Sequence, residues 1–325
     1  MDPLAQTLAL LAMATMATKA IEVIPLDMAP DSFDDQYRGC GPAMTAALPA
    51  LNRSEFQQNP LFAQAWPKAI AEWQSRGSPL SPLSSPAQAI ALMAYTMNDL
   101  YEQFNAAVRA AGRSRREYRD NFHFKTLHFL LSQALVTLRD AQSLGCPKVY
   151  RGVRKYQFKA ERGDIVRFGQ FSSASQSEET AEMFGDATVF QVRTCHGVEI
   201  QEFSKYPGEK EVLIPPFETF EVIEISQKGD RVRIELCSTG TFSKYNCEWL
   251  RGDTPLVLVL LPWHRFLTGQ LLEGLFQDGC LGTVTMVATL AIMATVVTVD
   301  KVTIVAIMAS VALVASFLWG SWWPS

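Results

Sequence analysis

Hydrophobic periodicity changes near residue 147, and this change restricts the possible folds more than any other property of the sequence. Apolar side chains recur with helical spacing from about Arg53, again over 86–111 and over 121–142, and Gly145 and Pro147 end the last run. Beyond them, short segments alternate apolar and polar residues with the period of a β-strand. We therefore expect an α+β fold in which helices come first and strands follow.

The second half predicts short strands joined by tight turns. The expected strands cover 149–151, 165–171, 189–192, 212–214, 220–225 and 232–236. Lys228-Gly229-Asp230 predicts a hairpin turn between the last two strands. A capping-box pattern at 175–178 predicts a short helix that ends near Gly185. Residues 21–50 carry several prolines and glycines and are expected to be irregular.

Both ends of the chain are apolar and enclose a polar body. Residues 4–17 are too few to span a membrane and are followed by small residues, so 1–20 is expected to be a signal peptide, with a buried helix as the alternative. Two charge-poor stretches within 281–325 are each just long enough to cross a bilayer. They predict an anchor, formed either by a transmembrane segment or by a signal exchanged for a GPI anchor. Between the ends we expect one secreted domain, 21–253, and a linker, 254–280.

Charge and cysteine usage exclude several classes of function. Lys and Arg total 29 against 33 Asp and Glu, a net charge of −4, which does not favour nucleic acid as the main partner. The six cysteines include no C-x-x-C pair and the four histidines are scattered, so no metal site is indicated. In a secreted domain the cysteines are expected to form disulfides, whose connectivity the spacing leaves open. Asn52-Arg53-Ser54 is a glycosylation sequon, which would require a surface loop.

A pair of carboxylates is the first candidate for chemistry. Glu209 and Glu211 lie two residues apart where a loop is expected to enter a strand, so both should project to one side with Cα atoms about 6.5–7 Å apart. Paired carboxylates at that separation suit chemistry at a sugar carbon that passes through an oxocarbenium-like state. A solvated acidic strand edge is the alternative.

Two further segments combine groups that bind anions or donate hydrogen bonds. Arg151 is expected at a strand end, beside Gly152, which would let a ligand approach the backbone closely. Hydroxyls gather at 171–175, where a strand is expected to pass into a helix. A surface salt bridge and simple helix capping are the respective alternatives. The basic stretch 109–125 is interpreted as a solvated helix face and loop, with a phosphate or an acidic partner as the second interpretation.

Taken in chain order, Arg151, the F-x-S-x-S segment at 171–175 and the E-x-E pair of Glu209 and Glu211 follow one another along the chain. This order resembles the R-S-E pattern of the vertebrate arginine-specific ecto-mono-ADP-ribosyltransferases. Further similar segments are Asp34–Tyr37, Ala94–Thr96, Asn121–Lys125 and Glu211–Pro216. The resemblance covers most of the body and implies an NAD-binding core of two packed β-sheets preceded by helices. It implies transfer of ADP-ribose from NAD to arginine side chains of acceptor proteins, with NAD as co-substrate and no prosthetic group or metal.

The resemblance also assigns roles to residues by position. Arg151 would contact the phosphates and ribose of NAD, and the Gly152 backbone would hold the nicotinamide amide. Ser173 would orient Glu211, the catalytic glutamate that stabilises positive charge as nicotinamide leaves. Glu209 would bind the acceptor guanidinium. Further implied contacts to the dinucleotide are Phe184, stacking on the nicotinamide ring, and Tyr95, Gln170 and Ser204.

Cysteine pairing follows from the same resemblance. It implies a disulfide between Cys40 and Cys247 and another between Cys146 and Cys195, which leaves Cys237 unmatched within the body.

One position departs from the family pattern, which usually carries three consecutive hydroxyls at 173–175. Here Ala174 stands in the middle, and activity would be reduced if that hydroxyl contributed to NAD affinity. Two rival functions use the same fold: an NAD glycohydrolase, in which water is the acceptor, and an inactive membrane-tethered binding module. Glu209 argues against the first, since hydrolysis requires no carboxylate to hold a guanidinium.

Overall fold

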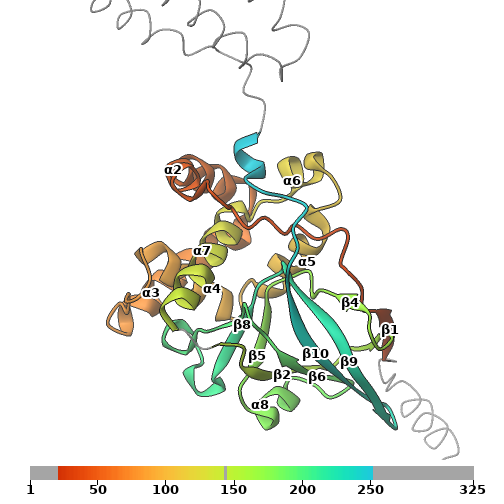
Figure 1. Cartoon of the computed structure of the whole chain (residues 1–325). Coiled ribbons are helices and arrows are strands. Elements are labelled where there is room, and N and C mark those ends of the chain that lie inside the picture. Colours follow the sequence, from red (N-terminus) through yellow and green to blue (C-terminus); the bar gives the residue numbers. More distant parts are fainter. Residues whose placement is uncertain (1–20, 143–144, 252–325) are drawn as a thin grey trace, which may run out of the picture. The chain divides into compact units, whose positions relative to one another are not determined.

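A computed structural model describes residues 21–142 and 145–251 (Figure 1). Helices occupy the first half and strands the second, so the predicted α+β order is confirmed. The predicted signal peptide, linker and apolar tail lie outside the described residues. Within the ranges that are described, no helix is both long and apolar enough to cross a membrane.

The helical half packs around α4 and α7. Its helices are α2 (Gly41–Gln58), α3 (Pro60–Ser75), α4 (Pro86–Thr96), α5 (Tyr101–Ala111), α6 (Arg115–Asn121) and α7 (Lys125–Gln142). Helix α4 contacts α3, and α7 contacts both α2 and α4. Leu92 and Leu131, one from each of the two central helices, are fully buried in the hydrophobic cluster between them.

Two helix predictions are corrected. Helix α2 begins inside the segment that was expected to be irregular, because Pro42 lies in its first turn, where the missing N–H group would have had no partner. The periodic run 86–111 is two helices, α4 and α5, separated by residues 97–100. Asn52 of the sequon lies within α2 and is half-buried, so this described segment lacks the surface loop that a glycan there would require.

The strands form one mixed sheet that is nearly divided in two. Its order is β4 (Ile165–Val166), β9 (Glu218–Lys228), β10 (Arg231–Thr241), β6 (Thr188–Arg193), β2 (Lys148–Val153), β5 (Ser172–Ser175), β8 (Glu211–Ile214) and β7 (Val198–Glu199). Strands β6 and β10 are parallel and the other pairs antiparallel. Between β2 and β5 only one residue pair is in register, Tyr150 opposite Ser175. The two sheets that the resemblance implied are therefore two parts of one sheet that meet at this pair.

Smaller elements complete the strand half. Strand β1 (Glu22–Pro25) pairs in parallel with β3 (Tyr156–Lys159). The predicted strand 165–171 is shorter than expected, and after it Gly169 takes a positive φ of 62°. The hairpin turn between β9 and β10 is confirmed. The short helix is α8 (Glu178–Met183), which begins after Ser177 because the Ser177 hydroxyl accepts from the Thr180 N–H at 3.1 Å.

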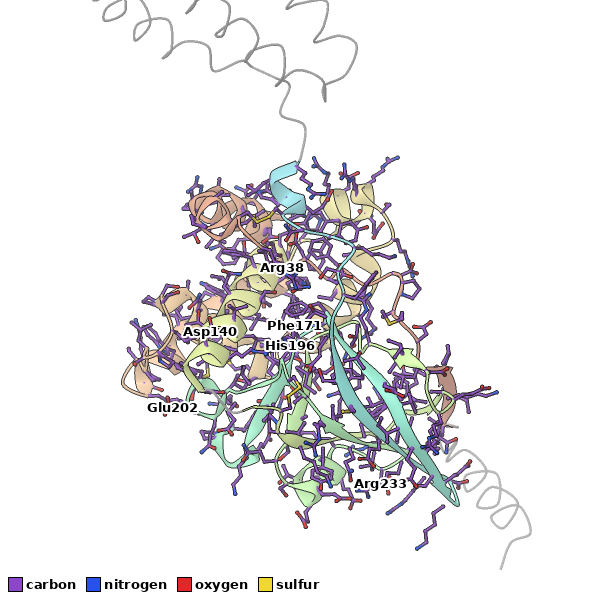
Figure 2. The ribbon with its side chains drawn as sticks, viewed as in Figure 1. Arg38, Asp140, Phe171, His196, Glu202 and Arg233 are labelled. Atoms are coloured by element: carbon purple, nitrogen blue, oxygen red, sulfur yellow. A yellow bond between two sulfur atoms is a disulfide. The ribbon has the colours of Figure 1, made fainter. Side chains whose placement is uncertain are left out.

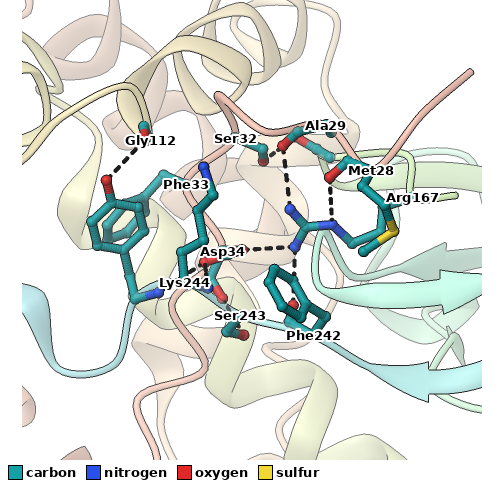
Figure 3. Close-up of polar contacts among 12 residues, drawn as sticks. Met28, Ala29, Ser32, Phe33, Asp34, Gly112, Arg167, Phe242, Ser243 and Lys244 are labelled. Atoms are coloured by element: carbon teal, nitrogen blue, oxygen red, sulfur yellow. Dashed lines mark hydrogen bonds and ion pairs between the residues drawn. The ribbon is translucent and has the colours of Figure 1, made fainter. Parts of the chain in front are cut away.

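A buried ion pair ties the N-terminal arm, the segment between β1 and α2, to the sheet (Figure 3). Arg167 Nη1 lies 2.7 Å from Asp34 Oδ2, and both side chains are fully buried. The same guanidinium donates to the carbonyl groups of Met28, Ala29 and Phe242. The Arg167 charge is therefore paired with a carboxylate and surrounded by hydrogen-bond acceptors, which compensates for its burial.

Both disulfides implied by the resemblance are present. Cys40 pairs with Cys247, and Cys146 with Cys195, whereas Cys237 is free and half-buried. The first bridge joins residues 207 positions apart, so it links the helical half to the segment that follows β10.

Candidate active site

A cleft of about 810 Å³ opens where β2 and β5 separate, with α4, α5 and α8 around it. Eight of the nine predicted site residues line it: Tyr95, Arg151, Gly152, Gln170, Ser173, Phe184, Glu209 and Glu211. The ninth, Ser204, is fully buried behind Glu211. The structure thus brings together residues that are up to 116 positions apart in the chain, from 95 to 211.

Glu211 is the first residue of β8 and lies opposite Ser175 of β5. Its side chain is buried, and its Oε2 atom accepts a hydrogen bond from the Ser204 hydroxyl at 3.2 Å. Burial raises the pKa of Glu211, hydrogen bonds from Ser173 and Ser204 act in the opposite direction, and the neighbouring Glu209 adds to the increase. The two hydroxyls therefore stabilise the ionised form of a carboxylate that its surroundings desolvate.

Glu209 is presented differently from the way the strand pattern predicted. It ends the 3₁₀ helix η2 (Pro207–Glu209), and Lys210 adopts a left-handed conformation with φ 47° before β8 begins. The two glutamates thus lie where a loop enters a strand, as predicted, and both line one cleft, but a turn separates them in place of the two strand steps that the predicted spacing assumed. The Ser175 hydroxyl donates to the Glu209 carbonyl at 2.7 Å and holds this turn. Burial raises the pKa of the half-buried Glu209 carboxyl.

Arg151 and Gly152 lie on β2, at the point where the two parts of the sheet meet. Arg151 Nη1 donates to the Ser173 carbonyl at 2.7 Å and so bridges β2 and β5 beside the cleft. A Cβ atom on Gly152 would lie 2.1 Å from the Ala181 carbonyl oxygen and 2.3 Å from that of Gly185. Gly152 is therefore required because α8 and Gly185 approach its backbone closely. From the sequence, a ligand and not the protein itself was expected to make this close approach.

Tyr95 belongs to a buried polar chain at the back of the cleft. Its hydroxyl donates to the carbonyl of Phe171, a residue buried between the helices and the sheet (Figure 2), and burial raises the pKa of Tyr95 to about 12. Asn105 Nδ2 donates to the same hydroxyl at 3.2 Å. Asn105 is buried and lines the cleft, and its Oδ1 atom has no hydrogen-bond partner within the described ranges. Sequence reasoning missed Asn105.

Most arginines of the basic stretch lie at the surface, in agreement with its first interpretation, but Lys125 is buried, and its Nζ atom donates to the Arg119 carbonyl at 3.1 Å. Three of its arginines form ion pairs away from the cleft: Arg113 with Asp31, Arg115 with Glu248, and Arg116 with Asp120. Arg109 differs, because it lines the cleft and contacts the side chain of Gln170. It follows Asn105 by four residues, so the two share one face of α5. That spacing was the available signal for Asn105.

Phe184 and Ala174 have contrasting surroundings. Phe184 follows α8 at the cleft rim with 53% of its surface exposed, which leaves its ring free to meet a ligand. The Ala174 side chain is buried in the strand cluster with Val149 and Val212, although the residue also borders the cleft. A hydroxyl at position 174 would therefore enter a largely apolar environment.

Fold and site together define an α+β enzyme in which a buried glutamate, an arginine that bridges two strands and a second carboxylate meet in one open cleft. Over residues 21–142 and 145–251, no three His, Cys, Asp or Glu side chains are grouped to hold a metal ion.

Comparison with known proteins identifies the family. The family model of NAD:arginine ADP-ribosyltransferases matches residues 26–244, and the chain belongs to this family. An erythroblast NAD(P)(+)–arginine ADP-ribosyltransferase of Gallus gallus is 51% identical over 234 residues, covering 71% of this chain and 78% of the relative. A GPI-linked NAD(P)(+)–arginine ADP-ribosyltransferase 1 of Mus musculus is 51% identical over 239 residues, covering 70% and 74%.

Solved structures agree with this assignment. The crystal structure of the eukaryotic mono-ADP-ribosyltransferase ART2.2 matches with a TM-score of 0.59 and 34% identity, over 70% of this chain and 98% of that one. A mutant of the same protein was solved in complex with NAD and matches with a TM-score of 0.59 and 33% identity over the same shares. The resemblance, the α+β fold class and the enzyme class predicted from the sequence are confirmed.

Proposed function

We propose that this chain transfers ADP-ribose from NAD to arginine side chains of acceptor proteins and releases nicotinamide. The observation that carries the proposal is the buried Glu211 carboxylate, held by the Ser204 hydroxyl at 3.2 Å, with Glu209 two residues before it and Arg151 beside it in one cleft. Membership of the NAD:arginine ADP-ribosyltransferase family supports the same reaction.

We assign the bond-breaking step to Glu211. The bond between the ribose C1′ and the nicotinamide nitrogen breaks, and its electron pair leaves with nicotinamide. Positive charge develops on the ribose, and the ionised carboxylate stabilises it more strongly in a desolvated site than it would in water. The Ser173 hydroxyl helps to keep Glu211 charged and oriented.

The remaining cleft residues are assigned to binding NAD. Arg151 contacts the phosphates and ribose, the Gly152 backbone holds the nicotinamide amide, and Phe184 stacks on the nicotinamide ring. Tyr95 and Gln170 contact the rest of the dinucleotide. The position of Ser204 behind Glu211 favours a role in holding that carboxylate over the contact to NAD that the resemblance implies.

We assign the acceptor step to Glu209, which lies at the end of η2 and is partly accessible. Its carboxylate binds the arginine guanidinium, whose pKa is above about 12, and accepts a proton as one guanidinium nitrogen attacks C1′. The new bond joins that nitrogen to C1′, and the released proton passes from Glu209 to water.

The test is incubation with NAD labelled in its ADP-ribose part and an arginine-rich acceptor, with label counted in the acceptor and in free ADP-ribose. Glu211→Gln should reduce both products by about 10²–10³-fold, because the charge that stabilises the transition state is lost. Glu209→Gln should lose transfer and retain hydrolysis. The control is Glu202→Gln, an exposed glutamate (Figure 2) that does not line the cleft.

Three results would contradict the assignments. Normal transfer by Glu209→Gln would remove its acceptor role. Absence of both cleavage and transfer in the unaltered chain would favour the inactive module, and cleavage without transfer would favour the glycohydrolase.

We further propose that the enzyme acts at the extracellular face of the plasma membrane, held through its apolar tail by a GPI anchor. A relative in mouse is named GPI-linked, and the two disulfides fit an oxidising compartment. A phospholipase that cleaves GPI anchors should release the activity from cells. Retention on treated cells would indicate a transmembrane segment instead.

A further inference from the structure

Arg76, the residue that follows α3, lies outside the cleft and yet contacts the backbone that carries Ser204. Its Nη1 atom donates to the Ser204 carbonyl and its Nη2 atom to the Lys205 carbonyl, each at 2.7 Å. These residues are 128 and 129 positions away in the chain. The planar guanidinium therefore holds two consecutive carbonyl groups with two charge-assisted hydrogen bonds.

Glu72 completes this contact from the same helix. Its Oε1 atom lies 2.7 Å from Arg76 Nε, and its Oε2 atom lies 2.7 Å from Lys205 Nζ. The hydrogen bond from Lys205, and then that from Arg76, lowers the pKa of Glu72 below its ordinary value and so favours its charged form. All three side chains are between 22% and 32% exposed, which shields their contacts from full solvent screening. We call Arg76, Glu72 and Lys205 the Arg76 clamp.

The clamped segment is also fixed on its other side. The Lys205 N–H donates to the Thr96 hydroxyl, at the end of α4, at 2.8 Å. The Ser204 hydroxyl accepts from the Tyr206 N–H at 3.1 Å and donates to Glu211 Oε2 at 3.2 Å. Because the bond from Tyr206 depends on the path of the backbone, the direction in which the Ser204 hydroxyl points depends on that path as well.

Building on the role proposed above for Glu211, we propose that Arg76 and Glu72 are positioning residues for the catalytic carboxylate. They hold the backbone of 204–206 so that the Ser204 hydroxyl remains directed at Glu211. Ser204 is one of two hydroxyl groups that favour the ionised form of this buried carboxylate. When the clamp is removed, Glu211 loses that hydrogen bond for part of the time and ionises only at higher pH.

The test compares Arg76→Met with Arg76→Lys, which keeps the charge without the two-pronged geometry. We expect Arg76→Met to move the acid limb of kcat for NAD cleavage upward by about one pH unit, as loss of a hydrogen bond to a charged group implies, with KM for NAD changed less than about twofold. Arg76→Lys should give a smaller shift. Adding Arg76→Met to Ser204→Ala should shift the limb no further than Ser204→Ala alone, because both act through one hydrogen bond.

The matched control is Lys68→Met on the same helix. Lys68 pairs with Asp99 at 3.3 Å, is 56% exposed and is not among the residues that line the cleft. It should leave the pH profile unchanged. A purely structural role for Arg76 would lower the melting temperature without moving the acid limb, and that result, or additive shifts in the double variant, would overturn the proposal.

A measurement that needs no activity separates this inference from the proposed function. Exchange of the Lys205 and Tyr206 amide hydrogens should be about tenfold faster in Arg76→Met than in Lys68→Met, because the backbone that they belong to has lost its clamp. Unchanged exchange would overturn the clamp even in an inactive protein. If the unaltered chain is inactive and Arg76→Met still shows the faster exchange, the proposed function is refuted and the structural role of the Arg76 clamp is supported.

Discussion

Glu211 is subject to two opposing requirements at once. Desolvation strengthens its attraction to a developing positive charge, and the same desolvation raises its pKa and so reduces the fraction that is ionised. Hydrogen bonds from Ser173 and Ser204 offset part of this increase, and the charge of Glu209 adds to it. The surroundings of one carboxyl group therefore set the pH range in which the enzyme can act.

The pH profile follows with a definite sign. We expect the acid limb of kcat/KM for NAD cleavage to lie above the ordinary pKa of a glutamate, about 4.3. Ser204→Ala should move the limb further upward, because it removes a hydrogen bond that favours the charged form. Glu209→Gln, read by hydrolysis, should move it downward, because it removes a like charge. Shifts of both variants in one direction would contradict this account of Glu211.

We expect that protonation of Glu211 reduces activity in acid without unfolding the protein. The folded state holds Glu211 at a raised pKa, so protonation favours the fold. Its contribution to stability is present at low pH and is lost as the pH rises through the folded-state pKa. Circular dichroism recorded alongside the rate measurements separates the two effects.

Among the elements, α7 depends on a side chain from a neighbouring helix. Glu55 of α2 is buried, and its two carboxylate oxygens accept the N–H groups of Lys125, at 2.5 Å, and Thr126, at 2.9 Å. These N–H groups begin α7 and have no partner within the helix. A negative charge at this end also interacts favourably with the helix dipole.

Replacing this cap should be costly. We expect Glu55→Ala to lower the free energy of unfolding by about 2–3 kcal/mol, because two buried N–H groups lose their acceptors. Ser114→Ala is the matched comparison: the Ser114 hydroxyl accepts from the Glu117 N–H at 3.0 Å, but at an exposed helix start. That variant should cost about 1 kcal/mol. Denaturant unfolding measures both, and equal losses would argue against burial as the reason.

Element prediction succeeded where periodicity is strong and failed where tertiary contacts override it. The hairpin turn at Gly229 and the helical face of α7 could be derived locally. Strand β1 could not, because four exposed or half-exposed residues become a strand only by pairing with β3, more than 130 positions away. The turn between Glu209 and Glu211 was missed because a left-handed Lys210 has no clear sequence signal.

At the scale of the molecule, the two ends of the body are joined to each other. The Cys40–Cys247 disulfide and the Arg167–Asp34 ion pair both connect the N-terminal arm with the sheet or the segment after it. The Asp34 carboxylate also accepts two backbone N–H groups, from Lys244 at 2.8 Å and Tyr245 at 3.1 Å. Because these links couple the helical half to the strand half, we expect the two halves to unfold together.

The long-range disulfide should contribute most to this coupling. In the chain-entropy model, the Cys40–Cys247 disulfide, whose cysteines are 207 positions apart, stabilises the fold by up to about 5 kcal/mol. The Cys146–Cys195 disulfide, whose cysteines are 49 positions apart, stabilises it by about 4 kcal/mol. We expect the double serine variant of Cys40 and Cys247 to lose more stability in denaturant unfolding than that of Cys146 and Cys195. Cys237→Ser removes no bridge and serves as the control. A smaller loss for the longer loop would show that native-state strain outweighs chain entropy.

Local patterns were enough to establish the order of helices before strands, the family resemblance and most of the residues that meet in the cleft. These properties depend on periodicity and on short motifs, both of which involve residues that are close together in the sequence. The fold alone decided that α8 requires Gly152, that Ser204 lies behind Glu211, that Asn105 enters the cleft and that Arg76 holds the segment carrying Ser204. Apart from Ser204 and Glu211, which are 7 positions apart, these contacts join residues that are distant in the chain, and such contacts form only when long-range packing brings the residues together.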